Sequence, residues 1–227
     1  MRGEGVLDGA CGRAKQTHLG SLLVDIKTGW SPACESHPPA VDEWGVVRVS
    51  SVTSGRFKPN ESKRLPAGLH PRPELEIRAG DVLLARANGA RALVGTVCYV
   101  EATRPNLMLS DKILRLVPDE TVADPEFLAV LLATKDVRRQ IGNLLNGGTG
   151  QNNISQADVR ALKIPQVPVH EQRRIVAAHA AFDRRMATLD AVLGKTRAAK
   201  DAVISQMMVD ATGQLSPSEP RHPGADE

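Results

Sequence analysis

The chain has 227 residues, 41% of them hydrophobic, which is enough for one large or two small domains with an apolar core. No run of about 18 uncharged apolar residues occurs, which argues against a membrane-spanning helix, and the N-terminus has no apolar signal-peptide core. Its three cysteines are odd in number, far apart and without a CxxC pair. This pattern is typical of reduced thiols in a cytoplasmic protein and predicts neither a disulfide nor a zinc site.

Charge is distributed unevenly along the chain, although the formal net charge is only +3. Residues 56–91 carry eight Lys/Arg against four acids, a net +4, and residues 135–174 carry seven against three, again +4. Residues 210–227 carry a net −3. Two basic blocks in the body of the chain suit an anionic partner, although solvated protein faces give the same pattern.

The first half of the chain is predicted to form short β-strands. After a polar, Gly-rich stretch over 1–17, which we expect to be disordered, runs of Val, Leu and Ile are separated by Gly, Pro and Asn. The predicted strands are Gly45–Val52, Asp81–Ala87, Ala92–Val100 and Asp111–Val117. Asn88-Gly89 is a hairpin-turn signal flanked by Arg86 and Arg91, so the hairpin tip is a candidate for insertion into a DNA groove.

From Asp124 the pattern becomes helical. Asp124 and Pro125 suit the start of one helix, and a second amphipathic helix ends at Asn146-Gly147. A Gly-rich stretch over 147–150 precedes three amide side chains, and Ser155 starts a further short helix with a capping-box spacing. The three amides are Gln151, Asn152 and Asn153. They are candidates for DNA contact or for bracing the domain.

A long uninterrupted helix is predicted from about Glu171 to Val209, and its apolar residues follow a heptad. The predicted dimerisation residues are Ile175, His179, Phe182, Met186, Leu189, Leu193, Val203 and Met207. Thr196 and Lys200 weaken the seam and are candidates for fixing register. At about 1.5 Å per residue, the helix is too long for one small domain to cover, which favours a partner helix of the same kind. The alternative is a single amphipathic helix lying on its own domain.

Motifs for catalysis are missing from the sequence. His170-Glu171 begins like HExxH but the fifth position is Arg174, and the GGTG stretch lacks the Lys-Ser/Thr of a phosphate-binding loop. There is no GxGxxG after a strand, no GxSxG, and no amino-methyltransferase or nuclease motif. We therefore predict a binding protein with no catalytic residue, no metal and no cofactor. A diverged stand-alone nuclease or methyltransferase is the enzyme alternative.

Three ordered motifs resemble the specificity subunits of type I restriction-modification systems. They are Gly80–Arg86 (GDVLLAR), Gly150–Asp158 (GQNNISQAD), and Ile164-Pro165 with Pro168 and Glu171-Gln172 entering a long helix. The resemblance covers roughly residues 18 to 209. Val167-Pro168-Val169 departs mildly from the consecutive prolines usual in the family, as does Val159 from the usual Leu.

The resemblance implies a mixed α/β target-recognition domain that reads part of a bipartite site in double-stranded DNA. It also implies a long spacer helix, partner methyltransferase (modification) subunits, and a separate restriction/translocase subunit. The domains expected are a disordered N-terminus over 1–17, a target-recognition domain over 18–168, a dimerising spacer helix over 169–210 and a disordered tail over 211–227. Full-length members resemble two copies of domain plus helix, whereas this chain has one. It is therefore either a half-subunit that forms a homodimer or a fragment of a longer reading frame.

Sequence-specific DNA recognition needs cationic groups at phosphates and Arg, Asn or Gln at base edges. The candidate DNA-binding residues are Arg56, Lys58, Lys63, Arg64, Arg86, Asn88, Arg91, Gln151, Asn152 and Asn153. Of these, the first loop and the hairpin are favoured for base contact. The binding alternative is an orphan protein-interaction module that keeps its assembly surfaces without DNA specificity of its own.

Overall fold

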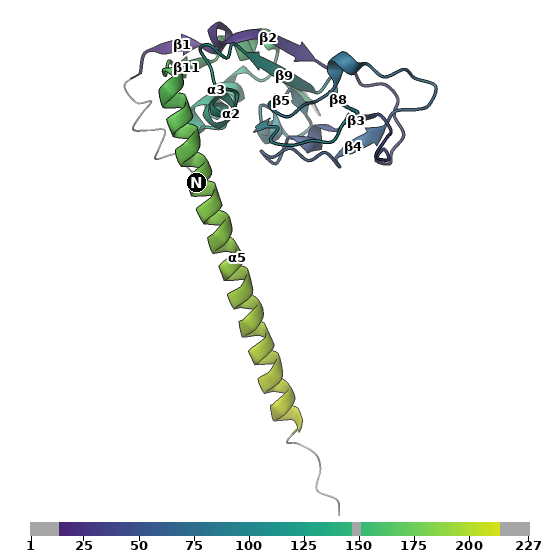
Figure 1. The fold of residues 1–227 in the computed structure, drawn as a ribbon, viewed down its shortest axis with the longest axis vertical. Coiled ribbons are helices and arrows are strands. Elements are labelled where there is room, and N and C mark those ends of the chain that lie inside the picture. The colour runs from purple at the N-terminus through teal and green to yellow at the C-terminus, as the bar shows by residue number, and fades with distance from the viewer. Residues whose placement is uncertain (1–13, 147–150, 214–227) are drawn as a thin grey trace, which may run out of the picture. The chain divides into compact units, whose positions relative to one another are not determined.

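A computed structural model describes residues 14–146 and 151–213, with side chains to Asp210, and it divides the chain into two compact units, 1–179 and 180–227. The strands are β1 Gln16–His18, β2 Leu23–Thr28, β3 Gly45–Val47, β4 Ser62–Arg64, β5 Val82–Ala85, β6 Ala87–Asn88, β7 Val97–Tyr99, β8 Leu107–Met108, β9 Ile113–Pro118, β10 Asn152–Asn153 and β11 Lys163–Pro165. The α-helices are α2 Pro125–Leu132, α3 Lys135–Leu144, α4 Gln156–Ala161 and α5 Val169–Gly213; short 3-10 turns are η1 Leu19–Leu22, η2 Val49–Ser51, η3 Pro73–Leu75 and η4 Arg91–Leu93. The predicted mixed α/β class with a long C-terminal helix is confirmed (Figure 1).

The main sheet is antiparallel, in the order β2-β9-β5-β7, and it lies between two apolar clusters. Alternate side chains of β5 explain this: Val82 and Leu84 join the cluster formed with α2 and α3, while Leu83 and Ala85 join the other cluster. Because both faces of β5 are buried, the strand reads in sequence as a continuous apolar run. A smaller sheet, β4-β3-β8, adjoins the second cluster and lies away from α2 and α3 (Figure 1).

Helices α2 and α4 each begin directly after a residue whose side chain caps the helix N-terminus. The Asp124 carboxylate accepts hydrogen bonds from the Glu126 and Phe127 N–H groups at the start of α2. Ser155 and Asp158 form the predicted capping box of α4. These contacts are local in sequence, which is why the sequence alone indicates them.

Several predicted boundaries are wrong. Residues 16–17, expected to be disordered, belong to β1. This strand pairs antiparallel with β11, so the start of the described chain is held against the segment before α5. The strand expected over 45–52 ends at Val47, where the chain enters η2. Strands β1, β2, β4, β8, β10 and β11 were not predicted, because short strands held by long-range pairing carry little local signal.

The predicted two-residue hairpin turn at Asn88-Gly89 is also wrong. β5 does pair with β7 as a hairpin, but the connection holds β6 and η4. Asn88 belongs to β6, which pairs with β10 from a distant part of the sequence. Long-range pairing therefore overrides the local turn preference of Asn-Gly.

Helix α5 begins at Val169 and continues to Gly213, three residues beyond the predicted end of the spacer helix. Its residues up to His179 belong to the first compact unit. The Gln172 side chain, 1% exposed, is buried in this first unit. None of the helices in the described part of the chain is long and apolar enough to cross a membrane.

Candidate nucleic-acid interface

Two segments singled out in the sequence lie side by side in the structure. β10 pairs antiparallel with β6, which places Asn152 opposite Asn88 and Asn153 opposite Ala87. The Ile154 N–H also donates to the Arg86 carbonyl at 3.0 Å. The amide-rich segment and the connection after β5 therefore form one surface element. The Gly-rich residues 147–150 lie outside the described residues.

Several polar side chains of this element hold the element itself together. Asn152 Nδ2 donates to the Gly89 carbonyl at 3.1 Å, and Asn88 Oδ1 accepts from the Ala90 N–H at 2.9 Å. The Arg91 guanidinium donates to the Gly142 carbonyl in α3 at 2.6 Å. Through these contacts Arg91 and Asn152 stabilise the folded domain. The Gln151 side chain is exposed, and the Arg86 side chain is half-buried.

The first predicted loop presents its cations to solvent. Arg56 and Lys58 are exposed in the turn between η2 and β4, and Lys63 is exposed on β4. Gly55 adopts a left-handed backbone conformation in this turn, with φ of 76°. The Lys58 N–H donates to the Ser51 carbonyl at 2.9 Å. Within the described part of the chain none of these three cations takes part in an ion pair, so each presents its positive charge to solvent.

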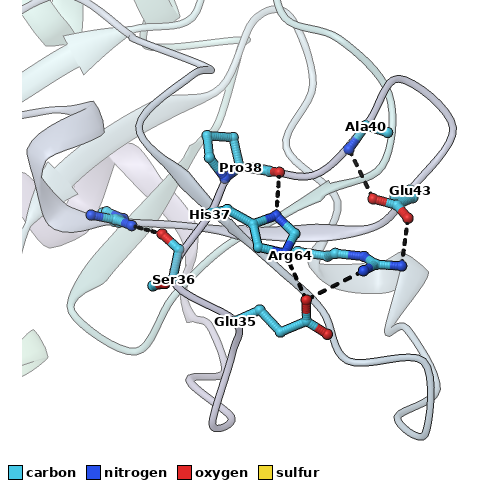
Figure 2. Close-up of polar contacts among 8 residues, drawn as sticks. Glu35, Ser36, His37, Pro38, Ala40, Glu43 and Arg64 are labelled. Carbon is cyan, nitrogen blue, oxygen red and sulfur yellow. Dashed lines mark hydrogen bonds and ion pairs between the residues drawn. The ribbon is translucent and has the colours of Figure 1, made fainter.

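Arg64 differs from its three neighbours because two carboxylates hold it (Figure 2). Its guanidinium lies 3.3 Å from Glu35 Oε2 and 2.6 Å from Glu43 Oε1, while Glu43 Oε2 accepts from the Ala40 N–H at 2.9 Å. Arg64 thus fastens the loop over 35–43 to β4. Its charge is compensated, so it is a weaker candidate for phosphate contact than Lys63.

His37 completes this cluster, with both ring nitrogens facing acceptors (Figure 2). Nδ1 lies 3.0 Å from the Pro38 carbonyl and Nε2 lies 2.8 Å from Glu35 Oε2. Only the imidazolium can donate from both nitrogens. The Pro38 carbonyl first, and Glu35 second, raise the pKa of His37 above its ordinary value of 6.5.

A largely buried ion pair joins β9 of the main sheet to Asp81, the residue before β5. The Arg115 guanidinium, from β9, donates to the Leu75 and Glu76 carbonyls at 3.3 and 2.5 Å and lies 3.1 Å from Asp81 Oδ2. Asp81 also accepts from the Arg78 N–H at 2.9 Å. Burial raises the pKa of Asp81, although Arg78 and Arg115 act in the opposite direction, and burial lowers the pKa of Arg115. Sequence reasoning missed Arg115; its signal was a single charge inside the apolar run 113–117.

The predicted dimerisation residues divide into two groups. Ile175 is 5% exposed and packs in the core of its own first unit, so the structure does not leave it available to a partner helix. His179 is the last residue of that unit. Met186 is half-buried, and the exposed members of the seam are Phe182, Leu189, Leu193, Val203 and Met207.

The chain belongs to the family of type I restriction modification DNA specificity domains, whose sequence profile matches residues 51–193. This confirms the resemblance seen in the three sequence motifs. Members of the family are non-catalytic specificity subunits, and among the described residues no cluster of three or more His, Cys, Asp or Glu side chains is placed to hold a metal ion.

Curated relatives of the chain are specificity subunits of type I restriction enzymes. The chain is 35% identical over 163 residues to the type I restriction enzyme EcoEI specificity subunit of Escherichia coli, an alignment covering 70% of this chain and 27% of that protein. It is 28% identical over 170 residues to the EcoKI specificity subunit of Escherichia coli strain K12, covering 71% and 34%. The chain therefore spans about a third or less of the length of these relatives.

Solved structures of low sequence identity share the fold. The S subunit of a type I restriction-modification system from M. genitalium aligns with a TM-score of 0.53 at 18% identity, over 84% of this chain and 45% of that one. The HsdS subunit from Thermoanaerobacter tengcongensis aligns with a TM-score of 0.57 at 18% identity, over 83% and 44%. Each match thus corresponds to slightly less than half of the solved chain.

Proposed function

We propose that this chain recognises double-stranded DNA by sequence and acts in the cytoplasm. In this proposal it directs methyltransferase and restriction/translocase subunits to a bipartite DNA site. The observation that carries the proposal is the group of exposed, uncompensated cations at Arg56, Lys58 and Lys63 in a member of a DNA specificity family. Such cations release counterions from the phosphate backbone and supply much of the binding free energy.

Phosphate contacts alone carry no sequence information, so base edges must be read by other groups. Arg86 and Gln151 are the best placed of the predicted residues, because Arg91 and Asn152 already hydrogen bond within the domain. Bidentate contact of Arg with guanine, or of Gln with adenine, would give discrimination at single positions.

The proposal includes a homodimer formed through α5. The exposed apolar side chains from Phe182 to Met207 support it, since isolated helices seldom leave so many apolar groups in water. A two-fold dimer would carry one recognition domain per copy and read two identical half-sites in inverted orientation.

The first experiment combines light scattering after size-exclusion chromatography with selection from a random duplex library. The proposal predicts a dimer that enriches inverted half-sites at a fixed spacing. A dimer that enriches no sequence, alone or with methyltransferase subunits added, would instead identify an orphan interaction module. Enrichment of one undivided half-site by a monomer would contradict the homodimer.

The second experiment neutralises the three cations in the triple variant R56Q/K58Q/K63Q. The slope of log affinity against log salt should become shallower by about 2.7, at roughly 0.9 per lost phosphate contact. The matched control is K27Q/R139Q/K163Q, which removes the same charge from exposed residues of β2, α3 and β11. If both triple variants change the slope equally, the first loop is not the DNA-binding site.

A further inference from the structure

We infer that Arg72, held over the ring of Trp30, reads one guanine of the target site through its guanidinium group. This inference rests on the proposed function and adds a specificity-determining residue that lies outside the first loop and outside the pair of strands β6 and β10. The Cζ atom of Arg72 lies 4.3 Å from the centroid of the Trp30 ring. The Arg72 side chain is exposed, and the Trp30 side chain is half-buried.

The backbone fixes both members of this stack against one segment, Met108-Leu109. The Trp30 N–H donates to the Leu109 carbonyl at 3.0 Å. Gly29 makes this approach possible, because a Cβ atom at residue 29 would stand only 2.0 Å from the Leu109 carbonyl oxygen. The Arg72 N–H donates to Met108 Sδ at 3.1 Å. Two residues that are far apart in the sequence are therefore held side by side.

Trp30 provides a rigid platform for the arginine. Its ring packs against the apolar cluster formed by Val46, Leu65 and Met108. Because a packed ring has few accessible rotamers, the guanidinium attracted to it is confined as well. A flexible surface arginine loses side-chain entropy when it binds, and this loss is smaller for an arginine that is already held in place.

The hydrogen-bond donors of the Arg72 guanidinium remain available to a ligand. In the part of the chain that the structure describes, no carboxylate or carbonyl oxygen accepts from them. Other arginines of the domain differ, because backbone carbonyls or carboxylates hold their guanidinium groups, as at Arg48, Arg64, Arg91, Arg104, Arg115 and Arg138. A free guanidinium fork fits the O6 and N7 atoms of guanine, the commonest base-specific contact in the major groove.

A cation suited to the phosphate backbone lies on the same face of the small sheet. Lys63 on β4 stands opposite Val46 on β3, and Val46 belongs to the apolar cluster that Trp30 covers. Residues directly opposite each other in an antiparallel pair share one face, so Lys63 and Trp30 lie on the same side. Burial raises the pKa of Cys34, a member of this cluster, and Lys63 acts in the opposite direction, which places its ammonium nearby. Lys63 can therefore contact a phosphate while Arg72 contacts a base edge.

Exchange of arginine for lysine separates base reading from charge. The wild-type chain first selects its preferred half-site from a random duplex library, with methyltransferase subunits present. Arg72→Lys keeps the positive charge but loses the fork, so discrimination against the other bases at one G·C pair should fall about tenfold or more. Affinity for sites that already lack this guanine should change by less than about twofold, because the phosphate contacts remain. Arg78→Lys, at another exposed arginine, is the matched control and should keep the full discrimination.

The other outcomes contradict the inference. An equal loss of affinity for all sequences in Arg72→Lys would identify a phosphate contact. No loss in Arg72→Lys would show that the stack only covers the apolar cluster. In both cases the wild-type chain still selects a sequence, so the proposed function stands. A wild-type chain that selects no sequence would overturn the proposed function and this inference together.

Tryptophan fluorescence tests the contact without sequence selection. The chain has two tryptophans, so Trp30 is the only one left in Trp44→Phe. Acrylamide quenching of Trp30 should fall about twofold when saturating duplex DNA is added, because a duplex within hydrogen-bond reach of Arg72 shields the ring from solvent. Unchanged quenching in a complex whose formation is followed by the anisotropy of a labelled duplex would overturn the inference.

Discussion

Gln172 Oε1 accepts a hydrogen bond from the backbone N–H of Asp124 at 2.7 Å. Its Nε2 donates to the carbonyls of Val122 and Val167, at 2.9 and 2.7 Å. Since Asp124 caps α2, one buried amide joins the first turns of α2 and α5 and the segment before α5. This explains why the Glu-Gln pair at the helix entry belongs to the sequence motif: the glutamine fixes the start of α5 on the domain.

We predict that Gln172→Leu lowers the free energy of unfolding by about 2–4 kcal/mol, because it leaves a buried N–H and two carbonyls without their partner. Urea denaturation measures the change. Gln166→Leu, at an exposed neighbouring glutamine, is the control and should stay within about 0.5 kcal/mol. Equal losses in the two variants would contradict the role assigned to the Gln172 amide.

The buried pair of Asp81 and Arg115 should show strong coupling. Arg115→Met removes the guanidinium from two carbonyls and from Asp81, so we expect a loss of about 3–5 kcal/mol of unfolding free energy. A double-mutant cycle with Asp81→Asn measures the coupling, which should exceed about 1 kcal/mol. Additive losses would show that Asp81 acts through the Arg78 N–H alone.

The loop over 35–43 should respond to pH through His37. Folding raises the pKa of His37 above 6.5, so its contribution is complete below that value and is lost as pH rises through the raised pKa. Hydrogen exchange of the loop should therefore become faster with rising pH than base catalysis alone predicts. An NMR titration should give a midpoint above 6.5 that moves down in Glu35→Gln. A midpoint unaffected by that substitution would show that Glu35 makes no contribution.

The Cys98 thiol should react very slowly in the folded protein. Burial on β7 raises the pKa of Cys98 to about 12, so roughly one molecule in ten thousand carries the thiolate at pH 8. Of the two cysteines that the structure describes, iodoacetamide labelling followed by peptide mass spectrometry should modify the half-buried Cys34 before Cys98, and Cys98 only in urea. Rapid labelling of Cys98 without denaturant would mean that β7 opens readily.

The sequence alone indicates the basic first loop and the amide segment as candidates for DNA contact, because each is a run of neighbouring residues. What the sequence did not indicate is which cations are available. Arg64 and Lys63 are neighbours with the same formal charge, yet Arg64 is held by Glu35 and Glu43, which lie about 20 to 30 residues earlier in the chain. Such pairing is long-range and leaves no local pattern.

The sequence by itself determined the caps of α2 and α4, the long helix and the ordered family motifs, because each depends on residues within a few positions of one another. Only the tertiary structure decided that Asn88 pairs with Asn152, that Gln172 joins two helix starts, and that Ile175 packs into its own domain. Heptad spacing alone cannot separate a residue buried by its own chain from one left for a partner. That distinction depends on which distant segments the fold brings against each helical face.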